Sequence, residues 1–243
     1  MNPSQIFNIS ARFIKKIGLI VFCQHVFYMR KIKNYNLYLV TGEEYSSNRT
    51  TLEIVTAAIN AGVTIVQMRE KKKSFEELKK LGAALKCVCR ENNVLFIVND
   101  DIFLAKAIDA DGVHLGEEDI KKYPLNIARE ILGDDKIIGV STHSIEEALR
   151  VSPMPEVDYI AFGPLFYTKT KNYSIGINDV REVSLKSAKP VVFIGGIDLD
   201  NIDLVLARGA KNIAVIRAIT EAEDVEGKVK LLKNKIKQYE NKN

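Results

Sequence analysis

Cysteine is too scarce and too irregularly placed in this chain to form a disulfide framework or a metal site. The three cysteines are Cys23, Cys87 and Cys89, an odd number without paired metal-ligand spacing. Cys87 and Cys89 stand two apart in a helix-like segment and therefore point to different faces. We expect buried or half-buried free thiols and a cytoplasmic protein, because a reducing compartment keeps thiols free.

Long apolar runs are also missing, which argues against stable insertion in a membrane. The densest apolar stretch of the N-terminal segment is Ile17–Cys23, whereas a membrane span needs about 20 such residues. The stretch follows basic residues, as in a signal peptide, but no small-residue cleavage site comes after it. We expect residues 1–34 to be an extension outside the fold and residues 35–243 to form one domain. A peripheral membrane anchor is the alternative for the extension.

The body of the chain lacks an excess of either charge. The net charge is +4, but residues 1–35 hold six Lys and Arg and no acid, so the remainder carries −2. A near-neutral body gives no electrostatic basis for a nucleic-acid partner. The proportions of 47% hydrophobic and 27% charged residues are typical of a soluble globular protein.

The chain does contain eight short apolar runs that alternate with segments of helical spacing, and each run ends in polar, charged or glycine residues. The runs are 37–40, 63–66, 94–98, 112–113, 137–140, 159–162, 191–194 and 213–216, and the helical segments are 51–60, 74–92, 102–108, 120–132, 144–151, 180–187, 200–208 and 224–239. Nearly continuous apolar runs are typical of parallel strands covered on both faces. Eight strand-then-helix units predict an α/β fold, a single-domain (β/α)₈ TIM barrel. An open doubly wound sheet would need a glycine-rich turn after the first strand, where only Gly42 stands.

Cations follow two of the predicted strands. Arg69 and Lys71 come just after the second run, and Lys171 lies in the loop after the sixth. Because the loops at the carboxyl ends of barrel strands meet over one mouth, we expect these side chains to converge. Three cations with nearby backbone amides predict a site for phosphate or diphosphate. A solvated charged face is the alternative.

Two carboxylates follow the third and fourth runs. Asp100 and Asp119 come from neighbouring predicted strands, so they are expected at the same mouth. Mg²⁺ binds one or two carboxylates and completes its shell with water and phosphate oxygens. These residues therefore predict a magnesium site, with a general acid–base pair and helix capping as alternatives.

A second anion site is predicted at the end of the barrel. The seventh and eighth strands are where such barrels commonly bind phosphate through backbone amides, and a tight glycine turn is the alternative. The residues in these positions are Gly195 and Gly196, the segment 214–218 with Ile216 and Arg217, and Thr168 and Thr170 from the preceding loop. Two anion sites predict two phosphorylated substrates, or one with phosphates at both ends. Of the three histidines, only His114 is expected in the mouth, with a satisfied core histidine as its alternative.

Together these segments resemble the thiamine phosphate synthase family, from about Tyr35 to the C-terminal helix. The motifs that carry the resemblance are Tyr38–Thr41, Val66–Lys71, Val98–Asp100, Ala110–Gly116 with Glu118-Asp119, Gly139–Ser141, Gly163–Lys171 and Ile194–Ile197. The resemblance implies an enzyme that joins hydroxymethylpyrimidine diphosphate to hydroxyethylthiazole phosphate with Mg²⁺ and releases diphosphate. It thus implies small phosphorylated partners and leaves open whether the chain forms a homo-oligomer.

The resemblance also implies roles for individual residues. Gln67 and His114 would border the pyrimidine, and Asp100 and Asp119 would hold magnesium. Thr168, Thr170 and Gly196 would take the thiazole phosphate. The diphosphate would be held by Arg69, Lys71, Asn99, Ser141 and Lys171, of which all but Asn99 are expected to be catalytic.

The chain departs from the family pattern at three positions. Arg217 stands where a small hydroxyl residue is common, and it either adds a phosphate contact or crowds the thiazole side. Glu117 replaces a common glutamine, and Gly42 replaces a common aspartate. A thiazole tautomerase of the same barrel type and a non-catalytic phosphate-binding barrel are the competing hypotheses.

Overall fold

The protein folds as a closed barrel of eight parallel strands, as predicted. The computed structural model describes residues 35–168 and 171–241. The strands pair in chain order, and β8 pairs with β1 to close the barrel. They are β1 Leu37–Val40, β2 Ile65–Met68, β3 Leu95–Asn99, β4 Gly112–Leu115, β5 Ile137–Thr142, β6 Tyr159–Phe162, β7 Val191–Ile194 and β8 Asn212–Val215.

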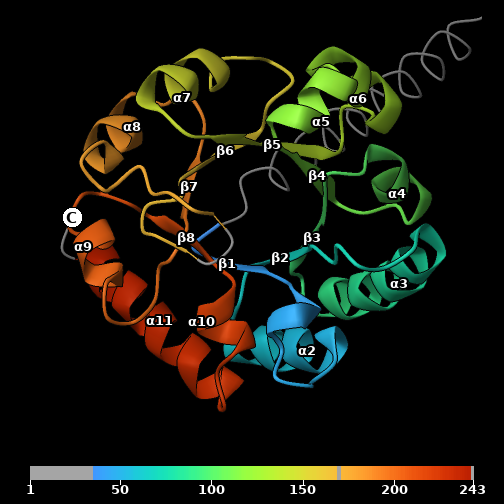
Figure 1. Ribbon diagram of the computed structural model, residues 1–243, viewed down its shortest axis with the longest axis horizontal. Coiled ribbons are helices and arrows are strands. Elements are labelled where there is room, and N and C mark those ends of the chain that lie inside the picture. The colour runs from blue at the N-terminus through green and yellow to red at the C-terminus, as the bar shows by residue number, and fades with distance from the viewer. Residues whose placement is uncertain (1–34, 169–170, 242–243) are drawn as a thin grey trace, which may run out of the picture. The chain divides into compact units, whose positions relative to one another are not determined.

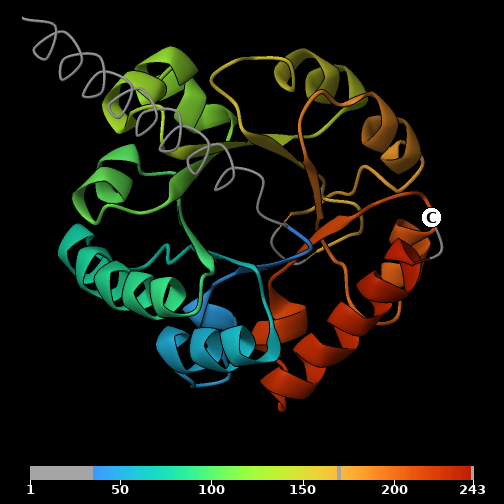
Figure 2. The same ribbon diagram turned by 180° about the vertical axis from the view of Figure 1, so that it is seen from behind.

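Helices surround the barrel on its outside (Figure 1), and Figure 2 shows the same ring from behind. They are α2 Thr51–Ala61, α3 Phe75–Glu91, α4 Ile102–Ala107, α5 Glu117–Lys122, α6 Leu125–Leu132, α7 Ile145–Val151, α8 Val180–Lys186, α9 Ile202–Leu206, α10 Arg217–Thr220 and α11 Val225–Glu240, with a 3₁₀ turn η1 at Glu43–Tyr45. The predicted capping box of α3 is present: Glu77 N–H donates to Ser74 Oγ, and Ser74 N–H donates to Glu77 Oε2.

Alternation along each strand divides the buried residues into two cores. In β1, Leu37 and Leu39 pack outward against the helices, whereas Tyr38 and Val40 point into the barrel. The outer core takes the same alternate positions from the other strands, together with the apolar faces of the helices. The inner core consists of Tyr35, Tyr38, Val40, Ile65, Leu95, Ile97, Ile137, Tyr159, Val192 and Ala214. The barrel interior is therefore filled with side chains, and only its mouth is open to ligands.

Some element boundaries differ from the prediction. Residues 120–132 were expected as one helix, but α5 ends at Lys122 and α6 begins at Leu125. Pro124 causes the break, because the residue before a proline avoids helical backbone angles and Tyr123 is extended, at φ −132° and ψ 96°. The second strand begins two residues later than the apolar run 63–66 suggested, so Gln67 lies within it.

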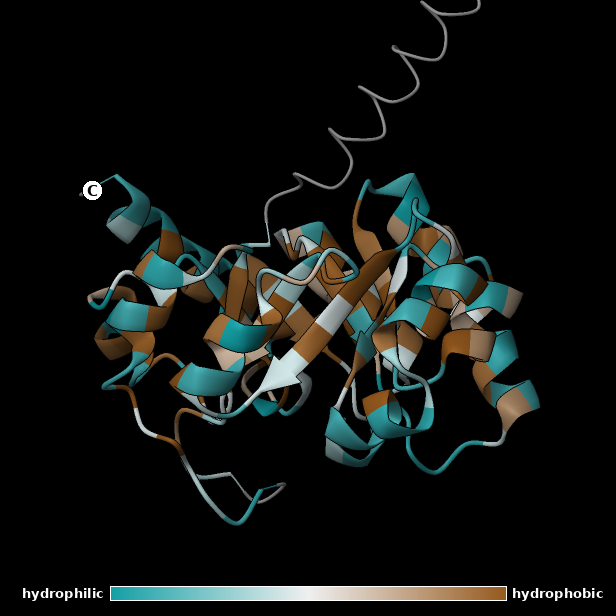
Figure 3. Ribbon diagram, turned by 90° about the horizontal axis from the view of Figure 1, so that it is seen from above, coloured by the Kyte–Doolittle hydropathy of each residue, from teal (hydrophilic) through white to brown (hydrophobic). Residues whose placement is uncertain are grey.

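The described parts of the loop between β6 and α8, residues 163–168 and 171–179, project from the side of the barrel toward which the strand arrows point (Figure 3). That side carries the carboxyl ends of the strands, where the polar residues were predicted to meet. Within the ranges 35–168 and 171–241, no helix combines the length and apolar character needed to cross a membrane. The expectation for residues 1–34 lies outside the described residues and stays a prediction.

The cysteine prediction is half right. Cys89 on α3 is buried, and burial raises the pKa of its thiol to about 12. Cys87 is exposed instead of half-buried, because it lies on the solvent face of the same helix. Both thiols are free, as expected.

Candidate active site

The carboxyl ends of β2, β3 and β4 bring Arg69, Lys71 and Asp100 together. Arg69 and Lys71 follow β2, Asp100 follows β3, and both cations lie near enough to lower the pKa of the Asp100 carboxyl. Asn99, the last residue of β3, pairs with His114 of β4 in the strand register. Charge interaction and strand register thus place these five predicted site residues along one part of the mouth.

Asp100 has a backbone conformation that is uncommon for a residue with a side chain. Its φ is 67°, in the left-handed region, and its N–H donates to the carbonyl oxygen of His114 at 2.8 Å. Asp101, not Asp100, caps α4 by accepting hydrogen bonds from Phe103 N and Leu104 N. The capping alternative therefore fails for Asp100, and its strained backbone is typical of a position held for function.

Asp119 at the start of α5 lies beside Asp100. The pKa of the Asp100 carboxyl is raised to about 6, first by burial and then by the charge and hydrogen bond of Asp119, although Lys71 and Arg69 oppose the shift. Asp119 also accepts the Gly116 N–H at 2.8 Å, so for this residue a capping contact is present as well. The mouth thus holds two adjacent carboxylates within reach of the charges of two cations.

The acidic pair suits a magnesium ion. No group of three or more His, Cys, Asp or Glu that could enclose a metal occurs in the described part of the chain. Mg²⁺ does not need one, since it binds through one or two carboxylates and takes its other ligands from water and phosphate. Asp100 and Asp119 lie side by side, and burial, followed by the charge and hydrogen bond of Asp119, raises the pKa of the Asp100 carboxyl. Carboxylate oxygens are ligands that Mg²⁺ accepts, so these residues fit the predicted ion.

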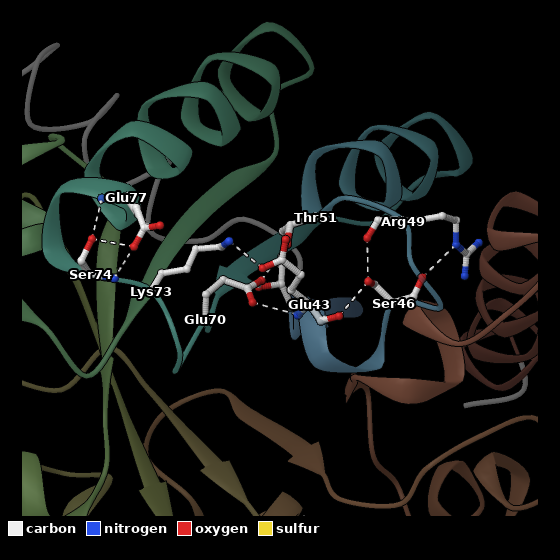
Figure 4. Close-up of polar contacts among 9 residues, drawn as sticks. Glu43, Ser46, Arg49, Thr51, Glu70, Lys73, Ser74 and Glu77 are labelled. Carbon is white, nitrogen blue, oxygen red and sulfur yellow. Dashed lines mark hydrogen bonds and ion pairs between the residues drawn. The ribbon is translucent and has the colours of Figure 1, made fainter.

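Glu70, which lies between the two cations, is buried and anchors the loops after β1 and β2. Its carboxylate accepts a hydrogen bond from Thr41 Oγ1 at 2.7 Å. It also accepts from Thr51 Oγ1 at 2.8 Å and from Glu43 N at 2.8 Å (Figure 4). Thr41 Oγ1 in turn accepts the N–H of Arg69 at 3.0 Å. The carboxylate therefore fixes the backbone from which the Arg69 and Lys71 side chains extend.

His114 is buried within a hydrogen-bonded network that crosses the barrel. Its Nδ1 lies 2.9 Å from the Tyr159 hydroxyl, and its Nε2 lies 2.9 Å from Ser141 Oγ. The Tyr159 hydroxyl is 2.9 Å from that of Tyr38, which accepts a hydrogen bond from Gln67 Nε2 at 2.8 Å. The predicted residues Gln67, His114 and Ser141 are therefore connected through two tyrosines.

Burial makes the His114 ring neutral. Burial, followed by the charge of His143, lowers the pKa of the imidazole to about 4. Both ring nitrogens have partners, as the core-histidine alternative requires. The partner of its Nε2 atom is Ser141, which is half-buried at the mouth. His114 is thus a core residue on one side and a site residue on the other.

Lys171 lies on the loop after β6, together with Thr168. The two residues form an isolated antiparallel bridge, and Thr168 Oγ1 accepts the Lys171 N–H at 3.0 Å. The Lys171 ammonium lies 5.9 Å from the centre of the exposed Tyr173 ring, whose other neighbour is His143 at 6.3 Å. Thr170 lies outside the described residues, and its role stays a prediction. The contacts of Lys171 are thus with its own loop and not with Arg69 or Lys71.

Gly195 and Gly196 have left-handed backbones, with φ of 104° and 66°. A Cβ on Gly196 would lie 2.8 Å from Phe166 Cβ, and one on Gly195 would overlap Pro164. The pair therefore lets the loop after β6 lie directly against the end of β7. This agrees with the alternative that the glycines serve a tight turn. Phosphate binding by their amides stays a prediction.

Arg217 begins α10, directly after Ile216, and its side chain reaches the loop after β1. The guanidinium lies over the Tyr45 ring, 4.1 Å from its centre, and Arg217 Nε is 3.6 Å from Glu221 Oε1. A Cβ on Gly42 would lie 2.8 Å from Tyr45 Cδ2. Two departures from the family pattern, at positions 42 and 217, therefore have one physical link, which is the Tyr45 ring.

Three residues of this region were not assigned a role from the sequence. Tyr38 and Tyr159 were counted within apolar strand runs, and Glu70 was quoted in a motif without a function. The alternation of strand side chains would have found the tyrosines, because both share the inward parity of Gln67 and His114. The sequence indicates a role for Glu70 more weakly, because its only distinguishing feature is an acidic residue between Arg69 and Lys71.

Comparison with known proteins agrees with the geometry. Residues 37–219 match the family model described as thiamine monophosphate synthase. A thiamine-phosphate synthase of Haloarcula marismortui is 41% identical over 84% of this chain and 98% of its own length. One of Persephonella marina is 39% identical over 82% and 94%. The solved thiamine phosphate pyrophosphorylase of Pyrococcus furiosus superposes with a TM-score of 0.78 at 36% identity, covering 87% and 98%. The chain belongs to the thiamine monophosphate synthase family.

Proposed function

We propose that this protein joins hydroxymethylpyrimidine diphosphate to hydroxyethylthiazole phosphate, giving thiamine phosphate and diphosphate. Support comes from the relatives called thiamine-phosphate synthase, which this chain matches over more than nine-tenths of their length. The observation that carries the proposal is the meeting of Arg69 and Lys71 with the Asp100–Asp119 pair. Cations beside an acidic pair suit a diphosphate bound with a divalent metal. Free thiols at Cys87 and Cys89 favour a cytoplasmic setting.

The reaction replaces one bond to the pyrimidine methylene carbon with another. The carbon–oxygen bond to diphosphate breaks, and the leaving group keeps the electron pair. The resulting pyrimidine-methyl cation is captured by the lone pair of the thiazole nitrogen. No protein nucleophile is needed, so the residues mainly stabilise charge that develops on the leaving group. Holding both substrates in line lowers the barrier further.

The residues take the following roles in this proposal. Arg69, Lys71 and Lys171 neutralise the departing diphosphate, and Asn99 and Ser141 donate hydrogen bonds to it. Asp100 and Asp119 would hold Mg²⁺, which when bound adds positive charge at the diphosphate oxygens. Gln67 and His114 border the pyrimidine. The thiazole phosphate is held by Thr168, Thr170, Gly195, Gly196, Ile216 and Arg217.

The test is a complete reaction with purified protein, both substrates and Mg²⁺. We expect thiamine phosphate and diphosphate in equal amounts, and neither product when one substrate is omitted. Binding of thiazole phosphate without product would reject the proposal in favour of a tautomerase or a binding protein. A tautomerase would then interconvert thiazole phosphate isomers, whereas a binding protein would leave the compound unchanged.

A further inference from the structure

A continuous hydrogen-bonded chain runs through the barrel interior from β2 to β5. Its members are Gln67, Tyr38, Tyr159, His114 and Ser141, which come from five different strands. The successive distances are 2.8, 2.9, 2.9 and 2.9 Å. All members but Ser141 are buried, so protein groups and not solvent satisfy their hydrogen bonds.

A single direction of hydrogen bonding runs along these five residues when each hydroxyl accepts one bond and donates one. The Gln67 amide nitrogen donates to the Tyr38 hydroxyl, and in that arrangement Tyr38 gives its single proton to Tyr159. The Tyr159 hydroxyl therefore accepts from Tyr38 and has its own proton for His114 Nδ1. A neutral imidazole that accepts at Nδ1 carries its proton at Nε2. Nε2–H then donates to Ser141 Oγ.

Ser141 is left with an unused proton. Within the described residues its hydroxyl has no hydrogen-bond partner other than His114 Nε2, and it lies half-buried at the open end of β5. Because its oxygen already accepts from the imidazole, its own O–H is free to donate into the mouth. With the opposite polarity, Ser141 would donate to His114 and turn lone pairs toward the ligand. Those lone pairs would repel an anion.

We propose that Tyr38 and Tyr159 are positioning residues, which hold His114 in the Nε2–H tautomer so that Ser141 donates its hydrogen bond to the anionic group of the substrate. The last clause rests on the proposed function, because it takes that group to be the diphosphate. The tautomer itself is a property of the free protein. Neither tyrosine needs to touch the substrate for this role.

The first test reads the tautomer directly in the full-length protein without substrate. Histidine labelled with ¹⁵N gives separate NMR signals for protonated and unprotonated ring nitrogens. The chain has three histidines, and the variants His25→Gln and His143→Gln assign the signals. We expect Nε2 of His114 to be protonated and Nδ1 to be bare. A proton on Nδ1 would overturn the proposal.

The second test removes the hydroxyl that fixes the tautomer. In Tyr159→Phe we expect His114 to populate the Nδ1–H form and kcat to fall by about tenfold or more, the usual effect of losing one hydrogen bond to a charged group. KM for the diphosphate substrate should change by less than about threefold, because ground-state binding by Arg69 and Lys71 is retained. Unchanged tautomer and kcat would contradict the proposal.

Tyr35→Phe is the matched control. Tyr35 is also buried in the barrel, and its ring lies 5.3 Å from that of Tyr159, but its hydroxyl has no hydrogen-bond partner among the residues the structure describes. We expect this variant to keep the wild-type tautomer and kcat. A kcat loss equal to that of Tyr159→Phe would indicate a general effect of core polarity and reject a role through His114.

A double-mutant cycle separates positioning from simple stability. If Tyr159 acts through Ser141, Tyr159→Phe should change kcat by less than about twofold in a Ser141→Ala background. An equal loss in both backgrounds would reject the pathway. If Tyr159→Phe does not fold, the wild-type tautomer decides the question by itself. Failure to form thiamine phosphate would reject the proposed function and leave the tautomer result standing.

Discussion

At the scale of single residues, the Asp100–Asp119 pair makes stability depend on pH. The folded-state pKa of Asp100 is raised to about 6, so ionising this carboxyl costs more in the folded than in the unfolded chain. Its favourable contribution is therefore present in acid and is lost as the pH rises from about 4 through 6. In metal-free protein we expect Asp100→Asn to be more stable than the wild type above this range.

Urea unfolding in the presence of a chelator measures this difference. The gain in free energy of unfolding for Asp100→Asn should be present at about pH 8 and should shrink as the pH falls through 6 toward 4. The control variant is Asp200→Asn, because Asp200 is exposed and contacts the carboxylate of Asp198 through its backbone N–H. A gain that is independent of pH would show that charge repulsion at Asp100 is not its source.

The same substitution should also impair activity. Under the proposed function, Asp100→Asn removes one carboxylate from the metal site, and we expect kcat to fall on the order of a hundredfold, because a metal supplies several kcal/mol of charge stabilisation. The Mg²⁺ concentration for half-maximal rate should rise. Initial rates across a Mg²⁺ series measure both effects. Superimposable curves for variant and wild type would count against the metal role.

Arg217 provides a prediction at the other substrate. Its guanidinium is held over Tyr45 at the end of β8, on the side proposed for the thiazole phosphate. We expect Arg217→Ala to raise KM for thiazole phosphate by about tenfold and to leave KM for the pyrimidine substrate within about twofold. Arg217→Lys should restore little, since an ammonium cannot stack as a guanidinium does.

Steady-state kinetics with each substrate varied in turn decide this placement. Arg208→Ala is the control, because Arg208 is half-buried just past the end of α9 and, among the described residues, its side chain donates to Leu204 O. Equal changes in both KM values for Arg217→Ala would mean that the side chain does not belong to the thiazole side. A lower KM would instead favour the crowding alternative.

At the scale of elements, the loops after β1 and β2 depend on one buried carboxylate. Glu70 accepts hydrogen bonds on both oxygens, from two threonine hydroxyls on Oε1 and from the Glu43 N–H on Oε2. Glu70→Gln removes the charge from these bonds, and its amide nitrogen must either replace the acceptor of the Glu43 N–H or reverse the threonine hydroxyls. We expect a loss of about 1–3 kcal/mol in the free energy of unfolding. Chemical denaturation measures it, with the exposed capping residue variant Glu77→Gln as the control. Equal losses would contradict the role of Glu70 as an anchor.

The elements themselves were largely predictable from the sequence. Eight apolar runs with polar ends led to the correct barrel, because strands covered on both faces must be apolar nearly throughout. Boundaries were less accurate where one residue decides them. Pro124 splits a segment of helical spacing into α5 and α6, and Gln67 lies within β2 although the apolar run stops before it. The periodicity of apolar residues does not predict helix and strand boundaries that depend on a single residue.

The candidate site was predictable in part, for a physical reason. Arg69, Lys71, Asp100 and Asp119 follow successive strands, so their meeting follows from the order of the chain. The Tyr38–Tyr159 contact joins residues 121 positions apart and exists only because the barrel brings β1 and β6 across its interior. Likewise, the contact of Arg217 with Tyr45 requires β8 to pair with β1. Local sequence patterns do not predict contacts between distant segments that form only when the barrel closes.

At the scale of the whole molecule, the domain assignment remains to be tested. The sequence predicts that residues 1–34 lie outside the barrel, and the described barrel begins at the buried residue Tyr35. We expect a protein starting at residue 35 to keep the melting temperature and kcat of the full chain. Thermal unfolding and the complete assay measure both quantities. A large fall in either would show that the extension contributes to the fold or the site.

We propose that the mouth of the barrel binds a diphosphate together with a divalent cation. Calorimetric titration of the full-length protein with inorganic diphosphate, with and without Mg²⁺, measures this binding. We predict tight binding only with Mg²⁺, and its loss in Arg69→Ala and Asp100→Asn but not in the control Asp200→Asn. Equal binding with and without Mg²⁺, or unchanged binding in both site variants, would contradict the claim.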